Sequence, residues 1–150
     1  MKFLVTEECK RLARWLRLMG YDTAERSTRS LSELHRQAYN EQRAVVTRNR
    51  RVRPSRLFRI IQLDSQHLSS QLQQLVRELG IRSDAAHAFS RCDRCNVEVE
   101  PIEASQVKDR VPPYVWRTQQ RFRRCPSCQR IYWAATHYER ISKTLEHVAR

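Results

Sequence analysis

Glycine is scarce in this chain of 150 residues, which has two glycines and five prolines. This composition excludes flexible linkers and low-complexity stretches. No apolar run approaches the ~18 residues of a membrane span, and no lipidation motif is present, so we expect no membrane attachment. The chain also starts without an apolar signal segment. We therefore expect a reducing, cytoplasmic location.

Acidic residues are few as well. The chain has 16 Asp and Glu against 29 Lys and Arg, a net charge of +13. A field of this sign favours polyanions, and nucleic acid is a better match than a membrane surface, which usually binds a basic amphipathic helix. RNA is thus the partner we expect.

Two clusters of basic residues are candidates for nucleic-acid contact. No acid occurs between Glu41 and Asp64, a stretch that is rich in arginine. Arginine favours bidentate phosphate contacts, and the aromatic residues of the second cluster favour base stacking. Ordinary solvated surface charge is the alternative interpretation. The candidate residues are Arg48, Arg50, Arg51 and Arg53 in the first cluster and Arg123, Arg124, Tyr132 and Trp133 in the second.

Two cysteine pairs carry the sharpest motif, Cys92-Asp-Arg-Cys95 and Cys125-Pro-Ser-Cys128. Two such turns supply the four thiolates of a tetrahedral zinc site. The segment between the pairs is longer than the commonest spacing of roughly 15–20 residues, and a hairpin excursion would accommodate it. Two disulfides or a redox pair are the alternative. We predict a structural zinc and a zinc ribbon in the last third of the chain.

The pattern before the cysteines predicts an α/β fold with three layers and a mainly parallel sheet. Glycines end the first and third predicted helices, and we expect Thr6, Ser30 and Ser65 to cap the helix starts. The boundaries we predict are residues 1–90 for this domain and 91–150 for the zinc ribbon with a C-terminal helix. The expected elements are strands at 2–5, 44–47 and 58–63, helices over about 7–19, 31–42 and 66–79, ribbon strands at 97–99 and 130–133, a helix-prone piece at 103–109 and a last helix at 138–148.

Several motifs together resemble one known family. The chain is similar to the PIN-like ribonucleases with an attached zinc ribbon, first described as the C-terminal RNase domain of the Mut-seven exonucleases. The resemblance spans nearly the whole chain. The matching segments are Met1-Lys-Phe-Leu-Val5, Leu12-Ala-Arg-Trp-Leu-Arg17, Gly20-Tyr-Asp22, Val45-Val-Thr-Arg48, Arg91-Cys92 to Asn96, Asp109 to Val115, and Arg124-Cys-Pro-Ser-Cys128 with Tyr132, Trp133 and His137.

The resemblance implies RNA cleavage by carboxylate-held Mg²⁺ or Mn²⁺ at the ends of the strands. This chain departs from the family at those positions, because Thr6, Ser32 and Asn49 stand where acids are expected. Some of the remaining nearby carboxylates are equally typical of charges at the start of a helix. The carboxylates that could regroup into a metal site are Glu7, Glu8, Glu33 and Asp64.

Three functional interpretations follow. The first is an RNA-binding protein on a ribonuclease scaffold whose metal chemistry is weakened or lost. The second is an active Mg²⁺- or Mn²⁺-dependent ribonuclease that uses regrouped acids, with Glu7, Glu33 and Asp64 as the candidates. The third is a protein-interaction module whose basic face meets an acidic partner.

Overall fold

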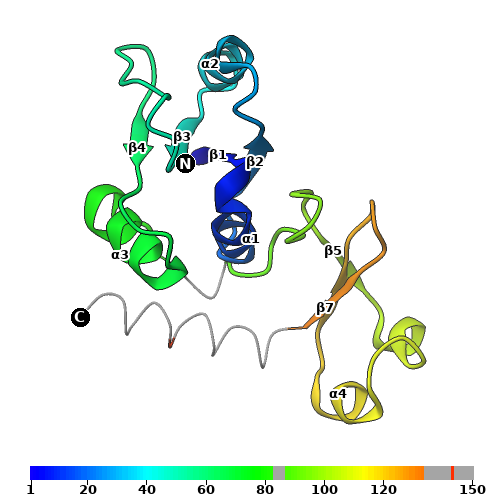
Figure 1. The fold of residues 1–150 in the computed structure, drawn as a ribbon. Coiled ribbons are helices and arrows are strands. Elements are labelled where there is room, and N and C mark those ends of the chain that lie inside the picture. Colours follow the sequence, from blue (N-terminus) through cyan, green and yellow to red (C-terminus); the bar gives the residue numbers. More distant parts are fainter. Residues whose placement is uncertain (83–86, 134–142, 144–150) are drawn as a thin grey trace.

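The computed structural model describes residues 1–82, 87–133 and 143 of the chain. A four-stranded sheet forms the first part, with strand order β2-β1-β3-β4 and every neighbouring pair parallel (Figure 1). This confirms the predicted α/β class with a mainly parallel sheet. The elements of this part are β1 (Lys2–Thr6), the 3₁₀ turn η1 (Glu7–Cys9), α1 (Lys10–Leu18), β2 (Asp22–Arg26), α2 (Leu31–Asn40), β3 (Ala44–Thr47), β4 (Ile60–Gln62) and α3 (Leu68–Leu79).

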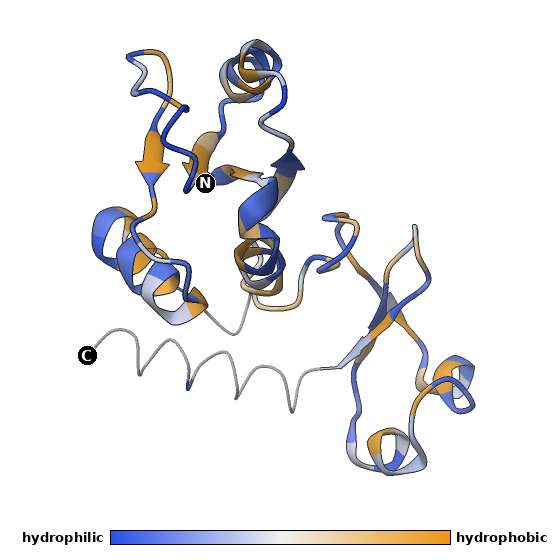
Figure 2. Ribbon diagram, viewed as in Figure 1, coloured by the Kyte–Doolittle hydropathy of each residue, from blue (hydrophilic) through white to orange (hydrophobic). Residues whose placement is uncertain are grey.

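Buried side chains alternate between the two faces of the sheet. Phe3 and Val5 of β1 pack with residues of α1 and α3, whereas Leu4 packs with residues of α2. Helices therefore cover both faces, α1 and α3 on one and α2 on the other (Figure 1). Parallel strands covered on both sides are continuously apolar, and the orange strands of Figure 2 show this for β3 and β4.

The predicted helix caps are confirmed only in part. Ser30 Oγ accepts a hydrogen bond from Glu33 N at 3.3 Å, which confirms the predicted cap of α2. Gly80 ends α3 with a φ of 63°, also as predicted. Thr6 makes no cap hydrogen bond, and His67 rather than Ser65 is the N-cap of α3. Those two predicted caps were wrong, and the Thr6 hydroxyl is instead engaged across the sheet.

Strand β2 was not predicted from the sequence. Only Thr23 of its five residues is fully buried, so the segment Asp22–Arg26 lacks the apolar run of the central strands. It lies at the sheet edge and pairs with β1 from Lys2↔Asp22 to Thr6↔Arg26. A polar edge strand of this kind protects the sheet from pairing with other chains.

The connection from β3 to β4 contains no helix. Because these strands are neighbours and parallel, residues 48–59 must return from the carboxyl end of the sheet to its amino end. Val52 anchors this crossover, since it is 2% exposed and packs in the cluster of Leu4, Leu34 and Val45. The crossover therefore runs along the α2 face of the sheet.

A second, antiparallel sheet follows, with order β5-β6-β7. The expected strand at 97–99 is only an isolated bridge between Arg91 and Glu98, and the strand begins at Glu100. The helix α4 was not predicted. Apart from residue 143, the predicted helix at 138–148 lies outside the described residues. The elements are β5 (Glu100–Ile102), the 3₁₀ turn η2 (Ala104–Val107), α4 (Pro113–Thr118), β6 (Phe122–Arg124) and β7 (Ile131–Trp133).

The segment that precedes the second sheet packs closely on the end of α1. Phe89 N donates to Leu18 O at 2.9 Å. Gly20 has a φ of 95°, and a Cβ there would overlap the carbonyl of His87, so glycine is required at this crossing. Within the described residues, no helix is long and apolar enough to cross a membrane.

Candidate functional site

The four cysteines of the two pairs come together. Their sulfur atoms all lie within 4.8 Å of one another, and Cys92 Sγ is 3.7 Å from Cys128 Sγ. A tetrahedron with Zn–S bonds of about 2.3 Å has S···S edges of about 3.8 Å. The described cysteines are free thiols rather than disulfides. This donor set fits a metal ion of the zinc type.

The two cysteine turns have the same backbone geometry. In each, the amide of the second cysteine donates to the first sulfur at 3.4 Å. The residue after the second cysteine then adopts positive φ, 61° at Asn96 and 62° at Gln129. Its amide donates to the carbonyl of the first cysteine at 2.9 Å in both turns. The backbone alone therefore orients the four thiol ligands.

Burial and hydrogen bonding give the thiols of the tetrad different pKa values. Burial disfavours the Cys92 thiolate, but hydrogen bonds from Tyr132 Oη and nearby backbone amides outweigh it and lower the pKa of Cys92 to about 7. Burial dominates at Cys125 and raises its pKa to about 11. Tyr132 is 7% exposed, and its hydroxyl lies 3.0 Å from Cys92 Sγ and 2.7 Å from Asp93 Oδ1. The Tyr132 ring is part of the core and is not presented for base stacking.

Two arginines of α1 attach the first cysteine turn to the sheet. Arg17 is 5% exposed and donates to Thr23 O at 2.8 Å, Asp93 O at 3.0 Å and Arg94 O at 3.2 Å. Arg14 is more exposed and binds the buried Asp93 carboxylate at 2.7 Å. The tetrad thus rests on the α/β part through a buried, hydrogen-bonded contact.

The carboxyl ends of β1 and β3 form a second polar site. Glu8 Oε1 accepts hydrogen bonds from Thr6 Oγ1 at 2.5 Å, Thr47 Oγ1 at 3.0 Å, Arg48 N at 2.9 Å and Asn49 N at 3.2 Å. The two threonine hydroxyls are fully buried and lie 2.8 Å apart. Four donors therefore converge on one carboxylate oxygen.

The donors around Glu8 favour its charged form. Burial raises the pKa of Glu8, but the hydrogen bonds from Thr6, Thr47 and the Arg48 amide outweigh it and hold that pKa below its ordinary value. From the sequence we interpreted Glu8 as a charge at the start of a helix or as one of four carboxylates that could regroup into a metal site. The signal that identifies it is the pair of threonines at the ends of β1 and β3, because two buried hydroxyl donors require an acceptor nearby.

The other candidate acids are not brought together. Glu7 accepts a hydrogen bond from Thr28, Glu33 forms an ion pair with Arg26, and Asp64 is largely exposed near Arg50 at 3.4 Å. Ser32 is exposed and contacts Ser30. Among the described residues, the cysteine tetrad alone gathers three or more His, Cys, Asp or Glu ligand atoms.

The strand ends offer little to a hard divalent ion. Mg²⁺ binds through carboxylates and waters in an octahedral shell. Thr6 and Asn49 carry no charge, and Glu8 Oε1 is engaged by four protein donors. A shallow pocket of about 380 Å³ adjoins this carboxylate, lined by Glu7, Glu8, Thr28, Arg48 and Asn49. These residues do not fit an Mg²⁺ site.

The candidate arginines lie at different places. Arg50, Arg51 and Arg53 are exposed on the crossover and Arg48 is half-buried at its start. On the second sheet, Arg123 is exposed, whereas Arg124 and Trp133 are half-buried. Cys9, the fifth cysteine, is buried in the core, and burial raises its pKa to about 11. His137 lies outside the described residues.

Comparison with known proteins gives a family for the chain. No curated protein and no solved structure matches it. The Mut7-C RNAse domain matches residues 1–145, which includes both the strand-end site and the cysteine tetrad. The chain belongs to the Mut7-C RNAse domain family.

Proposed function

We propose that this chain is an RNA-binding protein on a ribonuclease scaffold whose metal chemistry is weakened or lost. The observation that carries the proposal is the Glu8 carboxylate, which accepts four hydrogen bonds at the carboxyl ends of β1 and β3. Family membership supports RNA as the partner. Ligands of parallel α/β sheets bind at the carboxyl ends of the strands. Replacing the acids expected there by Thr6 and Asn49 would therefore change which ligand the sheet binds.

The chemistry of the strand ends supports loss of cleavage. A two-metal nuclease holds the attacking and leaving oxygens with cations that several carboxylates retain. Here the buried residues are Thr6 and Thr47, which carry no charge, and both hydroxyls donate hydrogen bonds to Glu8. Cation binding is weakened because Thr6 and Asn49 supply no charge and because the Glu8 carboxylate already accepts hydrogen bonds from the protein. No cleavage step is therefore assigned to this site.

The arginines of the crossover support RNA binding. Arg50, Arg51 and Arg53 are exposed, and no acid lies between residues 48 and 59. Arg50 has one weak partner, Asp64 at 3.4 Å, and both side chains are about 70% exposed. Such a pair contributes little, so the arginine remains available to phosphate. Arg123 on β6 would extend the contact.

The cysteine tetrad is proposed to hold a structural zinc. Four thiolates complete a tetrahedral shell and leave no open position for catalysis. In this proposal, residues 1–90 and 91–150 form two domains. The protein is located in the reducing cytoplasm, where thiolate ligands stay unoxidised.

The test is a binding and cleavage assay on the same RNA. Purified protein is incubated with labelled single-stranded and structured RNA, with and without Mg²⁺ or Mn²⁺. We expect binding that weakens steeply with salt and in the double variant Arg50→Ala/Arg51→Ala, with the RNA intact. Metal-dependent cleavage lost in Glu33→Ala or Asp64→Ala would establish the active ribonuclease instead. RNA affinity no better than that of an equally basic protein would favour the protein-interaction module.

A further inference from the structure

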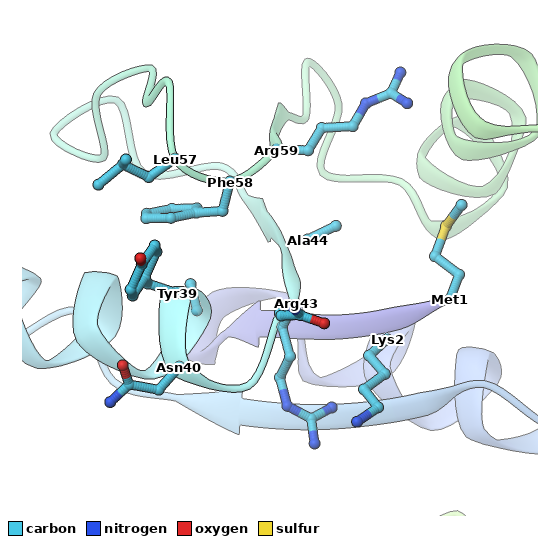
Figure 3. Close-up of a pocket in the computed structure, with 11 residues that line it drawn as sticks. Met1, Lys2, Tyr39, Asn40, Arg43, Ala44, Leu57, Phe58 and Arg59 are labelled. Atoms are coloured by element: carbon cyan, nitrogen blue, oxygen red, sulfur yellow. The ribbon is translucent and has the colours of Figure 1, made fainter.

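A groove of about 710 Å³ opens at the amino end of the sheet, opposite the strand-end site. Figure 3 shows Tyr39 and Phe58 on one side of it, and Lys2 and Arg59 further along. Its walls are the end of α2, the starts of β1 and β3, and the last residues of the crossover. The lining residues are Met1, Lys2, Ala38, Tyr39, Asn40, Gln42, Arg43, Ala44, Leu57, Phe58 and Arg59.

The groove presents apolar rings to solvent. Tyr39 is 56% exposed and Leu57 is 72% exposed. Phe58 is half-buried, and one face of its ring is supported by His35, with centroids 5.5 Å apart. Within the described part of the chain, the Tyr39 side chain forms no hydrogen bond and no ring-stacking pair. The Tyr39 ring is therefore available to stack on a flat ligand.

The charge of the groove selects the class of ligand. Its lining contains three cations and no Asp or Glu. Arg43 is already neutralised by Asp22 and Glu41, but Lys2 is exposed and Arg59 spends one guanidinium nitrogen on the carbonyl of Glu78 at 2.9 Å. Asn40 and Gln42 add amide donors and acceptors of the kind that pair with base edges. Rings, amides and cations without acids suit a nucleobase with its phosphate.

The crossover connects this groove to the proposed RNA site. It begins at Arg48 and Asn49, beside Glu8, and ends at Phe58 and Arg59 in the groove wall. An arginine-bearing segment thus runs along the sheet from one end to the other. A single strand bound by these arginines would reach the aromatic side chains.

We propose that the groove binds an unpaired base of single-stranded RNA, stacked on Tyr39, with the adjoining phosphate near Lys2 and Arg59. This inference rests on the proposed RNA-binding function and adds a site to it. Stacking on an aromatic side chain tolerates any base and requires an unpaired strand, because a paired base has no free face. The groove therefore favours single strands over duplexes.

The experiment compares two exposed tyrosines. Tyr39→Ala is measured beside Tyr39→Phe, which keeps the ring, and Tyr114→Ala, which removes a ring that is 69% exposed on α4. The probes are an unstructured RNA oligonucleotide containing 2-aminopurine and an RNA duplex. Both truncated side chains are exposed, so the variants fold.

We expect Tyr39→Ala to weaken single-strand binding roughly 5- to 100-fold and to abolish the change in 2-aminopurine fluorescence. Duplex affinity and the salt dependence stay unchanged, since Tyr39 carries no charge. Tyr39→Phe and Tyr114→Ala behave as the wild type. Equal single-strand affinity for Tyr39→Ala and wild type, with binding still lost in Arg50→Ala/Arg51→Ala, overturns the groove as an RNA site and leaves the proposed function standing. A wild type that binds no RNA overturns the proposed function itself.

Discussion

Replacing Arg17 by lysine should destabilise the protein far more than removing Arg14, although both contact the first cysteine turn. Arg17 is 5% exposed and donates to three backbone carbonyls, those of Thr23, Asp93 and Arg94. Lysine keeps the charge but lacks the planar fork that reaches several acceptors at once. Arg14 is the matched control, because its side chain is 54% exposed.

The magnitude follows from burial. A hydrogen bond from a charged donor contributes about 1.5–3 kcal/mol, and a buried acceptor left without a partner costs about 1–3 kcal/mol. Arg17→Lys loses at least one such bond, so we expect a loss of about 2–4 kcal/mol. Arg14→Ala breaks an ion pair between a half-exposed arginine and the buried Asp93 carboxylate. That carboxylate keeps the hydrogen bond from Tyr132 and has Arg130 at 3.7 Å, so we expect a loss of only about 1 kcal/mol.

Urea unfolding of the zinc-loaded protein, followed by far-UV circular dichroism, measures both losses. The slope of the transition should stay constant, since neither change alters the surface exposed on unfolding. Similar midpoints for Arg17→Lys and wild type, or a larger loss for Arg14→Ala, would refute the assignment of Arg17 as the buried link between the two parts.

Three further predictions concern the two sites. Glu8→Gln should cost about 1 kcal/mol near neutral pH and little at a pH below the folded pKa of Glu8. The folded pKa lies below the ordinary value of 4.5, so the charged form stabilises the fold above pH 4.5 and this stabilisation is lost as the pH falls through the folded pKa. Urea midpoints measured from neutral to acidic pH test this, and a cost that does not fall with pH contradicts it. Gln129→Gly should stabilise the fold by about 0.5–1 kcal/mol, because Gln129 has a φ of 62°. Asn96→Gly should destabilise it, because the Asn96 side chain accepts a hydrogen bond from Thr23 N at 2.8 Å. Thermal unfolding compares the two variants, and shifts of the same sign would contradict the different roles of these side chains. Chelation of zinc should lower the unfolding temperature of the whole protein, because Cys92 and Cys125 belong to the main core cluster. Calorimetry with and without a chelator tests this. An unchanged transition for the α/β part would contradict it.

The sequence predicted the parts of the fold that have strong periodic signals. The first helix, whose Leu12 and Leu16 are buried, and the apolar strand at 44–47 are confirmed, as is the close approach of the four cysteines. Strand β2 was missed because an edge strand needs few apolar residues. Helix α4 was missed because two consecutive prolines stand at its start, although proline at the first helical position is favourable.

The strand-end site depends on contacts between residues that are distant in the sequence. Thr6 before two glutamates matches a helix cap, and Glu7 and Glu8 match favourable first-turn charges. In the fold, the neighbour of Thr6 is Thr47, which lies 41 residues away and becomes adjacent only when β1 and β3 pair. The choice of Glu8 rather than Glu7 depends on which carboxylate the 3₁₀ turn η1 directs across the sheet. Tyr132 was similarly misjudged, since its burial depends on packing between the two parts.

Incubation of the pure protein with labelled single-stranded RNA in Mg²⁺ and in Mn²⁺ tests the central claim most directly. A single reaction reports both the bound fraction and the intact fraction. The account predicts RNA that is bound, released by salt and uncut in either metal. RNA cut only when metal is present, with cleavage abolished in Asp64→Ala or Glu33→Ala, would contradict it.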